Sequence, residues 1–248
     1  MEHNEYIKIA EVGEEMWWFR ALHRNMLMLI DRYLENRNGR LLDDGCGAGG
    51  FLRKFIMAHP SRSVYGIDIE PRAISVAATR SAAHLAVSSA NQLPFGDSSF
   101  AACISADIVY HCAAQPKDVI AEAHRCLQPG GILVIGSPAY EWMFSAHDDR
   151  VAGVRRYTRK SLSDPLIEAG FRIEYATYWN TLLFPLMVVR RKIMLPPDGE
   201  SDLKFMPVPV ELLFNIIMGV ESLLLGALMA AGLPLPFGGS VLVVARRL

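Results

Sequence analysis

The chain has 248 residues, of which 51% are hydrophobic and 21% are charged, and its formal net charge is −1. This composition excludes a disordered chain and leaves room for one large core or two small ones. The charge balance gives no overall attraction to nucleic acid, so we expect no nucleic-acid partner, although a local basic patch stays open.

The cysteines and the N-terminus indicate a cytoplasmic protein. Cys46, Cys103, Cys112 and Cys126 form no Cys-x-x-Cys pair, and no histidine pair stands nearby at zinc-finger spacing. We therefore expect reduced thiols and no metal site. Residues 1–15 are acidic and lack the basic start and apolar run of a signal peptide.

The first predicted element is a helix over residues 16–33. Beyond it, short apolar runs alternate with helical segments, which indicates parallel strands with helices on both faces of one sheet. The predicted strands cover residues 41–42, 63–69, 84–90, 100–106, 131–138, 171–179 and 240–247. The predicted helices between them cover residues 50–59, 71–82, 116–127 and 159–170.

Two groups of helix-breaking residues interrupt this pattern. Residues 128–131, with the sequence QPGG, are expected to form a turn that closes the helix before the fifth strand. Pro165 is expected to break or offset the start of the helix over residues 159–170.

Residues 180–239 form a long apolar insertion before the last strand. We expect two helices joined by the Pro-rich and charged linker of residues 195–210, a surface loop whose order stays open. The run over residues 214–237 approaches the length of a membrane span. Its Glu221, its three glycines and the strand that follows argue against a span.

The turn after the first strand reads LLDDGCGAGGF and fits two cofactors. Gly45, Gly47 and Gly50 have the spacing of a dinucleotide loop, whereas Gly45, Gly47 and Gly49 have that of a loop for S-adenosylmethionine. In both cases the glycines let the backbone approach a ligand at the start of a helix.

Acidic residues near this loop favour the methyl donor. Asp43 and Asp44 would repel a pyrophosphate, but they would attract the ammonium and sulfonium groups of S-adenosylmethionine. Asp68, at the end of the second strand, is placed to accept hydrogen bonds from the ribose hydroxyls of either cofactor. Strand-end polar residues without a ligand are the alternative.

Four motifs in order resemble the class I S-adenosylmethionine-dependent methyltransferases, and within them the type 11 group that includes the ubiquinone/menaquinone methyltransferases. The motifs read LLDDGCGAGG, VYGIDIEPRAI, ANQLPFGDSSFAACISADIVYH and AEAHRCLQPGGILVIGSP. The resemblance runs from about Leu41 to Phe171 and includes the last strand. It implies an α/β fold, a Rossmann-like seven-stranded sheet with an antiparallel last strand and a helical insertion between strands six and seven.

The resemblance also implies S-adenosylmethionine as the cofactor and a set of residues that contact it. These residues are Asp43, Gly45, Cys46, Gly47, Gly49, Asp68, Ile69, Ser89, Ala90, Asn91 and Ser105. Ser89 stands where many relatives have an aspartate that accepts from the adenine amino group. A hydroxyl accepts more weakly than a carboxylate, so we expect backbone groups or Asn91 to hold the adenine and cofactor affinity to be lower.

Three segments are candidates for the acceptor side. Tyr110 and His111 follow the fourth strand, and His147 opens the polar stretch of residues 145–160, so these three are the catalytic candidates. A base is needed only where the acceptor carries a proton at the working pH. Partly exposed loop residues without a catalytic role are the alternative.

The same polar stretch contains Arg155, Arg156 and Tyr157, the candidates for binding an anionic group on the acceptor. An ion-pair network with Asp148 and Asp149 is the alternative. Some relatives carry a further histidine just ahead of these arginines, where this chain has Gly153 and Val154.

Trp17 and Trp18 are the candidates for an apolar lid over the site, and core packing is their alternative.

We divide the chain into a helical lid over residues 1–38, a core over residues 39–179, the insertion over residues 180–239 and the last strand over residues 240–248.

The sequence favours a methyltransferase that acts on a hydrophobic small molecule, either lipid-like, isoprenoid or a natural product. The insertion would form an acceptor tunnel, contact a membrane surface peripherally or form a homodimer interface. The basic residues 190–192 suit an anionic surface or a phosphate head group, unless they are a solvated helix end. The remaining alternatives are a cyclase on the same fold, a non-catalytic scaffold and an NAD-dependent oxidoreductase.

Overall fold

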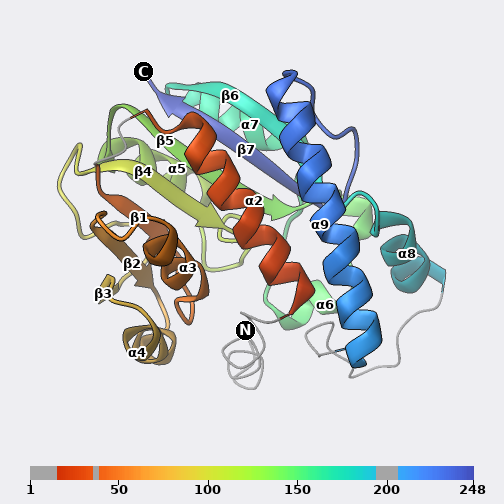
Figure 1. Ribbon diagram of the computed structural model, residues 1–248. Coiled ribbons are helices and arrows are strands. Elements are labelled where there is room, and N and C mark those ends of the chain that lie inside the picture. Colours follow the sequence, from red (N-terminus) through yellow and green to blue (C-terminus); the bar gives the residue numbers. More distant parts are fainter. Residues whose placement is uncertain (1–15, 36–38, 194–205) are drawn as a thin grey trace.

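The computed structural model describes residues 16–35, 39–193 and 206–248 (Figure 1). One sheet of seven strands has the order β3-β2-β1-β4-β5-β7-β6. The strands are β1 Leu41–Asp44, β2 Val64–Asp68, β3 His84–Val87, β4 Phe100–Ala106, β5 Leu127–Pro138, β6 Phe171–Trp179 and β7 Ser240–Arg247. The first five strands pair in parallel, whereas β7 is antiparallel to both β5 and β6. The predicted fold is therefore confirmed.

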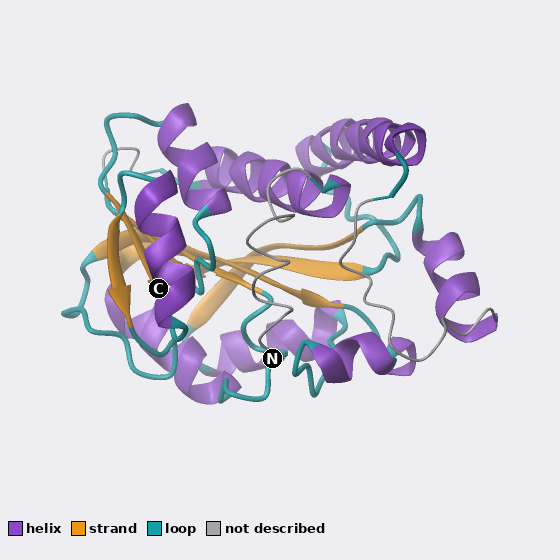
Figure 2. Ribbon diagram, turned by 90° about the horizontal axis from the view of Figure 1, so that it is seen from below, coloured by secondary structure: helices purple, strands orange, loops and turns teal. Residues whose placement is uncertain are grey.

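Helices cover both faces of the sheet (Figure 2). They are α2 Trp17–Tyr33, α3 Gly50–Ala58, α4 Pro71–Arg80, α5 Pro116–Cys126, α6 Ala146–Arg150, α7 Arg159–Glu168, α8 Phe184–Val188 and α9 Val208–Ala230. Two short turns complete the set, the 3-10 turn η1 Glu141–Met143 and the π turn η2 Val189–Ile193. Most of the linker prediction, and all of residues 1–15, lie outside the described residues.

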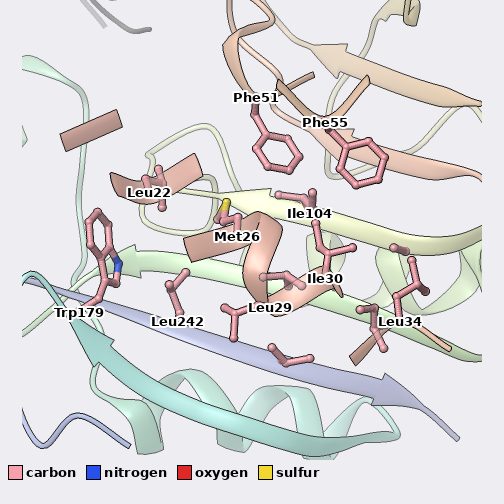
Figure 3. Packing of buried hydrophobic residues seen from close by; sticks show 14 of the residues in the cluster. Leu22, Met26, Leu29, Ile30, Leu34, Phe51, Phe55, Ile104, Trp179 and Leu242 are labelled. Carbon is pink, nitrogen blue, oxygen red and sulfur yellow. The ribbon is translucent and has the colours of Figure 1, made fainter. Parts of the chain in front are cut away.

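The helix α2 lies across one face of the sheet and fills the core there. Its Met26, Leu29 and Ile30 are each at most 1% exposed, and they lie over Ile104 of β4 and Leu242 of β7 (Figure 3). This spacing of three and four residues presents one apolar stripe of the helix to the sheet. The second half of α2 is thus a core helix.

Two local predictions are wrong in detail. The strand β5 begins at Leu127, opposite Phe100, and its next partner pair is Ala102 with Ile132, so residues 128–131 form a bulge within the strand instead of a turn before it. Pro165 lies inside α7 and does not offset its start. The hydroxyl of Thr158 accepts the Ser161 N–H at 3.1 Å and fixes the first turn of α7 ahead of the proline.

The helix α9 packs along α2, and its polar residues join it to the rest of the protein. The Glu221 carboxylate is buried and accepts the N–H groups of Asn180, Thr181 and Leu182 at 2.5, 2.8 and 2.8 Å. Within the described ranges, α9 is also the one helix long and apolar enough to cross a membrane by length and composition. Its Glu221 face is a protein contact, as the sequence argument expects.

Candidate active site

A cavity of about 500 Å³ lies at the carboxyl ends of β1, β2 and β4, where open α/β sheets bind ligands. It collects most of the predicted site residues. Those that line it are Trp17, Trp18, Asp43, Gly45, Cys46, Gly47, Asp68, Ile69, Ser89, Ala90, Asn91, Tyr110, His111, His147 and Arg156. Gly49, Ser105, Arg155 and Tyr157 do not line it.

The glycine loop is held against β2 and faces open space. The carbonyl oxygen of Ile67 accepts the N–H groups of Gly45 and Cys46, each at 2.8 Å. A side chain at Gly45, whose φ is +124°, would place its Cβ 2.0 Å from Cδ1 of Ile108. A Cβ at Gly47, whose φ is +51°, would meet no protein atom within 4 Å. The loop therefore leaves room for a ligand directly above Gly47.

Gly49 serves packing instead. It is the N-terminal cap of α3, and a Cβ there would lie 3.0 Å from the Ala77 Cβ of α4. Its predicted cofactor contact is absent from the described cavity because its α-carbon faces the neighbouring helix. Ser105 is buried beside Asp44 and likewise lies behind the cavity wall.

Three carboxyl groups line the same end of the cavity. Burial raises the pKa of Asp43 to about 7, with the charge of Asp68 adding to the effect, and burial also raises the pKa of Asp44 well above its usual value. The Oδ1 atom of Asp44 is buried without a hydrogen-bond partner among the described residues. A cation placed here would restore the ionised form of these groups and satisfy that oxygen.

Asp68 is oriented by backbone groups. Its Oδ2 accepts the Gly47 N–H and its Oδ1 accepts the Glu70 N–H, each at 2.9 Å. Each carboxylate oxygen has a second lone pair, so both can also accept from a ligand. Two oxygens fixed side by side suit a pair of neighbouring hydroxyl groups.

The adenine side differs from expectation at Asn91. Its Nδ2 donates to the Ala113 carbonyl at 2.8 Å, and its Oδ1 accepts the Gln115 N–H at 2.7 Å. The amide thus joins the loop after β3 to the loop before α5. Ser89 accepts the Asn91 N–H at 3.2 Å and helps to shape the same wall.

The two catalytic candidates after β4 are placed as hydrogen-bond donors. Nδ1 of His111 accepts the Ala113 N–H at 3.2 Å, and burial lowers the pKa of the ring, so the neutral form carries its proton on Nε2. Burial raises the pKa of the Tyr110 phenol, which stays protonated. A side chain at Gly153 would lie 2.2 Å from Cε2 of Tyr110, so the glycine makes room for this ring.

The polar stretch of residues 145–160 forms the Asp148 part of the ion-pair network that was the alternative, and the part with Asp149 stays a prediction. The Arg156 guanidinium contacts Oδ1 of Asp148 through Nη2 at 2.7 Å and Nε at 3.0 Å, with both side chains at most 3% exposed. Arg155 donates to the carbonyls of Val109 and Ala114 at 3.3 and 3.2 Å. Tyr157 donates to the Val109 carbonyl at 3.2 Å. Arg155 and Tyr157 therefore fix the loop behind the cavity and do not contact an acceptor there.

The tryptophans join the N-terminal end of α2 to the insertion. Trp17 packs edge-on against Phe214 of α9 at 5.4 Å, and Trp18 contacts Trp179 of β6 at 5.5 Å between ring centroids. Both tryptophans line the cavity and both pack against the core, so the expected place over the site and the alternative of core packing are compatible. Their action as a lid stays a prediction.

Sequence reasoning missed Asp107. It directly follows β4, lines the cavity and has a φ of +54°. Burial raises the pKa of its carboxyl to about 7, against the opposing effect of Arg156. The signal was available, because Asp107 is the first charged residue after a buried strand at the ligand-binding edge of the sheet. The insertion, which the sequence offered as an acceptor tunnel, contributes apolar and basic side chains to the lining, namely Leu183, Leu186, Met187, Phe214, Arg190 and Arg191.

Comparison with known proteins agrees with this geometry. Residues 42–135 match the family model described as a methyltransferase domain. Over this stretch the chain is similar to the type 11 methyltransferase domain. The ubiquinone/menaquinone-like subgroup within it stays a prediction.

The relatives and solved structures vary in their reported activities. The chain is 32% identical over 132 residues to 24-methylenesterol C-methyltransferase 2 of Oryza sativa subsp. japonica, covering 47% of this chain and 35% of that protein. It is 32% identical over 169 residues to an uncharacterized methyltransferase of Mycolicibacterium vanbaalenii, covering 62% and 65%. A geranyl diphosphate methyltransferase in complex with GPP and sinefungin has a similar fold, with a TM-score of 0.62 at 16% identity over 93% of this chain and 80% of that one.

The chain spans 35 to 38% of the length of the sterol methyltransferases and of a Streptomyces fradiae transposon protein that it matches. The family match supports S-adenosylmethionine as the cofactor, as the sequence predicts. The residues present fit it. Open space above Gly47, an unpaired buried oxygen of Asp44 and two oriented oxygens of Asp68 match a ligand with cationic groups and neighbouring hydroxyls.

Proposed function

We propose that this protein transfers a methyl group from S-adenosylmethionine to a hydrophobic small molecule, lipid-like or isoprenoid. One observation carries the proposal. The cavity is acidic at the glycine loop, whereas its other end combines apolar side chains from α2 and the insertion with the basic side chains Arg156, Arg190 and Arg191. These apolar side chains are Trp17, Trp18, Leu183, Leu186, Met187 and Phe214. The sterol and geranyl diphosphate named for two of its relatives are acceptors of the same chemical class.

The residues at the acidic end would hold the cofactor. Asp43 and Asp44 would face its cationic methionine part, and Asp68 would accept from its ribose hydroxyls. When bound, the cofactor would supply a methyl group that is readily transferred from its sulfonium sulfur to an acceptor atom aligned opposite the methyl–sulfur bond. The contribution of the protein is then mainly to hold the acceptor in line and to exclude water.

Asp107 is the group best suited to take a proton from the acceptor. It lines the cavity, and its pKa of about 7 is near the working pH, where a general base is most effective. Tyr110 and His111 line the same wall as neutral donors, so they would position a polar atom of the acceptor. His147 stays a catalytic candidate by its place in the lining alone.

A panel of acceptors tests the proposal. The full chain is incubated with S-adenosylmethionine carrying a labelled methyl group and, separately, a sterol, a prenyl alcohol, a prenyl diphosphate and small polar amines. Label transfer to an apolar acceptor and none to the amines is the expected result. Robust transfer to the amines, with none to the apolar acceptors, would contradict the proposed substrate class.

The same assay distinguishes the alternative activities. A cyclase of this fold would change the structure of the acceptor without changing its mass, and a scaffold would leave it unaltered. Liquid chromatography with mass spectrometry of every acceptor therefore separates all three: methyl transfer raises the mass, cyclisation changes the retention time at unchanged mass, and a scaffold changes neither.

A further inference from the structure

The outer face of α9 is apolar along its whole length. The residues of this helix that are exposed to solvent include no charged or hydrogen-bonding side chain. The large ones among them are 43 to 80% exposed and are Val208, Leu212, Leu213, Ile216, Val220, Leu223 and Leu224. They recur every three to four residues, so they form one continuous stripe, here called the outer α9 stripe.

Three polar residues of α9 contact other elements, whereas Asn215 donates from Nδ2 to the Glu211 carbonyl of the same helix at 2.8 Å. Glu211 accepts the Trp17 N–H at the start of α2, at 2.5 Å. Ser222 donates to Oδ1 of Asn25 at 2.7 Å, and buried Glu221 accepts three backbone N–H groups. A helix on the surface of a water-soluble protein has the opposite arrangement, with its apolar side inward and its polar side outward. The outer face of α9 therefore lacks the polar side chains of a helix that faces water.

The cavity reaches the surface beside this stripe. Leu186 of α8 lines the cavity and is 51% exposed, and Phe214 of α9 lines it while packing on Trp17. Leu182 and Val189, on either side of Leu186, are also exposed. Lys192, exposed at the end of the same segment, adds a positive charge at its edge.

We propose that the outer α9 stripe and the exposed leucines around α8 rest in the surface of a lipid bilayer. The hydrophobic acceptor then enters the cavity from the membrane, past Leu186 and Phe214. This second part rests on the proposed function, whereas the docking does not. Figure 1 shows α9 and α8 together on one side of the molecule, away from β1, β2 and β3.

A bilayer fits the stripe better than a second copy of the chain does. Protein interfaces carry about one hydrogen bond per 100–200 Å², and this stripe offers no side-chain donor or acceptor. Hydrocarbon requires none, and the positive charge of Lys192 at the edge suits anionic head groups. A helix that crossed the bilayer would carry the elements packed on it into the hydrocarbon, and α9 packs on α2 and β6, so only its outer side rests in lipid.

Co-sedimentation with vesicles tests the docking. The full chain is mixed with vesicles of phosphatidylcholine alone and of phosphatidylcholine with phosphatidylglycerol. The test variant is Leu212→Glu, Ile216→Glu and Leu223→Glu combined. The matched control is Met57→Glu, Val87→Glu and Ile167→Glu, which are exposed to a similar degree on other elements.

The expected result is that the wild type and the control sediment with vesicles and that the test variant binds them at least tenfold more weakly. Titration with S-adenosylhomocysteine shows that the test variant is folded, because none of its three sites lines the cavity. Wild type that stays in the supernatant with both vesicle types would overturn the docking. A wild type that is a dimer and a test variant that is a monomer would also overturn the docking, because the outer α9 stripe would then be the interface with a second copy.

The two proposals fail separately. Vesicle binding without methylation of any acceptor would leave the docking standing and remove the proposed function. Methylation of a detergent-dispersed acceptor by protein that does not sediment with vesicles would leave the proposed function standing and remove the docking.

Discussion

The two ends of the cavity are built in different ways. The cofactor end comes from one short stretch, β1 and its glycine loop, together with the ends of β2 and β4. The acceptor end is assembled from α2, the loop after β6, α8 and α9, and it is held by contacts such as that between Trp17 and Glu211, which are 194 residues apart. The first end is fixed by backbone conformation, whereas the second depends on side chains that meet only in the folded chain.

This difference separates what must stay constant from what can vary. Under the proposed function, backbone groups and carboxylates would hold the part of the ligand that every reaction of this kind shares. Apolar side chains on the insertion would shape the part that receives the acceptor, so specificity could change without disturbing the cofactor site. Four variants test this division.

The largest expected effect is at the acceptor end, on stability. Arg156→Met leaves buried Asp148 with Arg191 at 3.7 Å as its one remaining ion-pair partner among the described residues, and breaking a buried pair typically costs about 3–5 kcal/mol. Denaturant unfolding measures the loss. The double variant with Asp148→Asn should recover part of it. A stable single variant with a weakened acceptor KM would instead make Arg156 a substrate residue.

Gly45→Ala should weaken cofactor binding about a hundredfold, a cost of roughly 3 kcal/mol. The residue cannot keep a φ of +124° without strain, and its Cβ would displace Ile108 into the cavity. Calorimetry with S-adenosylhomocysteine measures the change. Gly130→Ala is the control, since it also has a positive φ with open space around it but does not line the cavity. Equal effects of the two changes on binding would contradict the assigned role of the loop.

Asp107→Asn should lower the rate by about a hundredfold with an acceptor that must lose a proton. The wild-type carboxyl, with its pKa of about 7, acts as a base only when ionised, so the wild-type rate should rise from pH 6 to pH 8. The variant should lose this rise while binding S-adenosylhomocysteine normally. An unchanged pH profile would remove Asp107 from the chemistry.

Gly153→Ala should have the smallest effect, about tenfold on the acceptor KM, or roughly 1.4 kcal/mol. The new Cβ would push the Tyr110 ring, which lies 2.2 Å from it, and would leave the glycine loop untouched. Steady-state kinetics in both substrates checks this. A matching loss in cofactor affinity would mean that the two ends are not independent.

The sequence predicted the elements where local pattern decides the outcome. The bounds of β4, β6 and β7 agree with the expected ranges, because β4 and β7 are mostly apolar runs and β6 begins with alternating apolar and polar residues. The cofactor loop was also predicted, because a turn with positive φ angles requires glycines, and these glycines can be located in the sequence. Bulged residues 128–131 were misread, because a bulge and a turn use the same glycines.

The acceptor end could not be predicted to the same degree. Nothing local shows that Arg155 and Tyr157 turn toward backbone carbonyls 40 to 50 residues away, at Val109 and Ala114, instead of toward a ligand. The orientation of α9, with three of its polar residues in contact with other elements, also depends on partners in α2 and after β6. Side-chain direction in such segments is set by tertiary contacts that no spacing rule encodes.

The most direct test of the central claim is a calorimetric titration of the wild-type chain with S-adenosylhomocysteine, followed by NAD. The acidic glycine loop predicts tight binding of the first ligand and none of the second, because Asp43 and Asp44 attract a cationic methionine part and repel a pyrophosphate. Binding of NAD, or of neither ligand, would contradict the account.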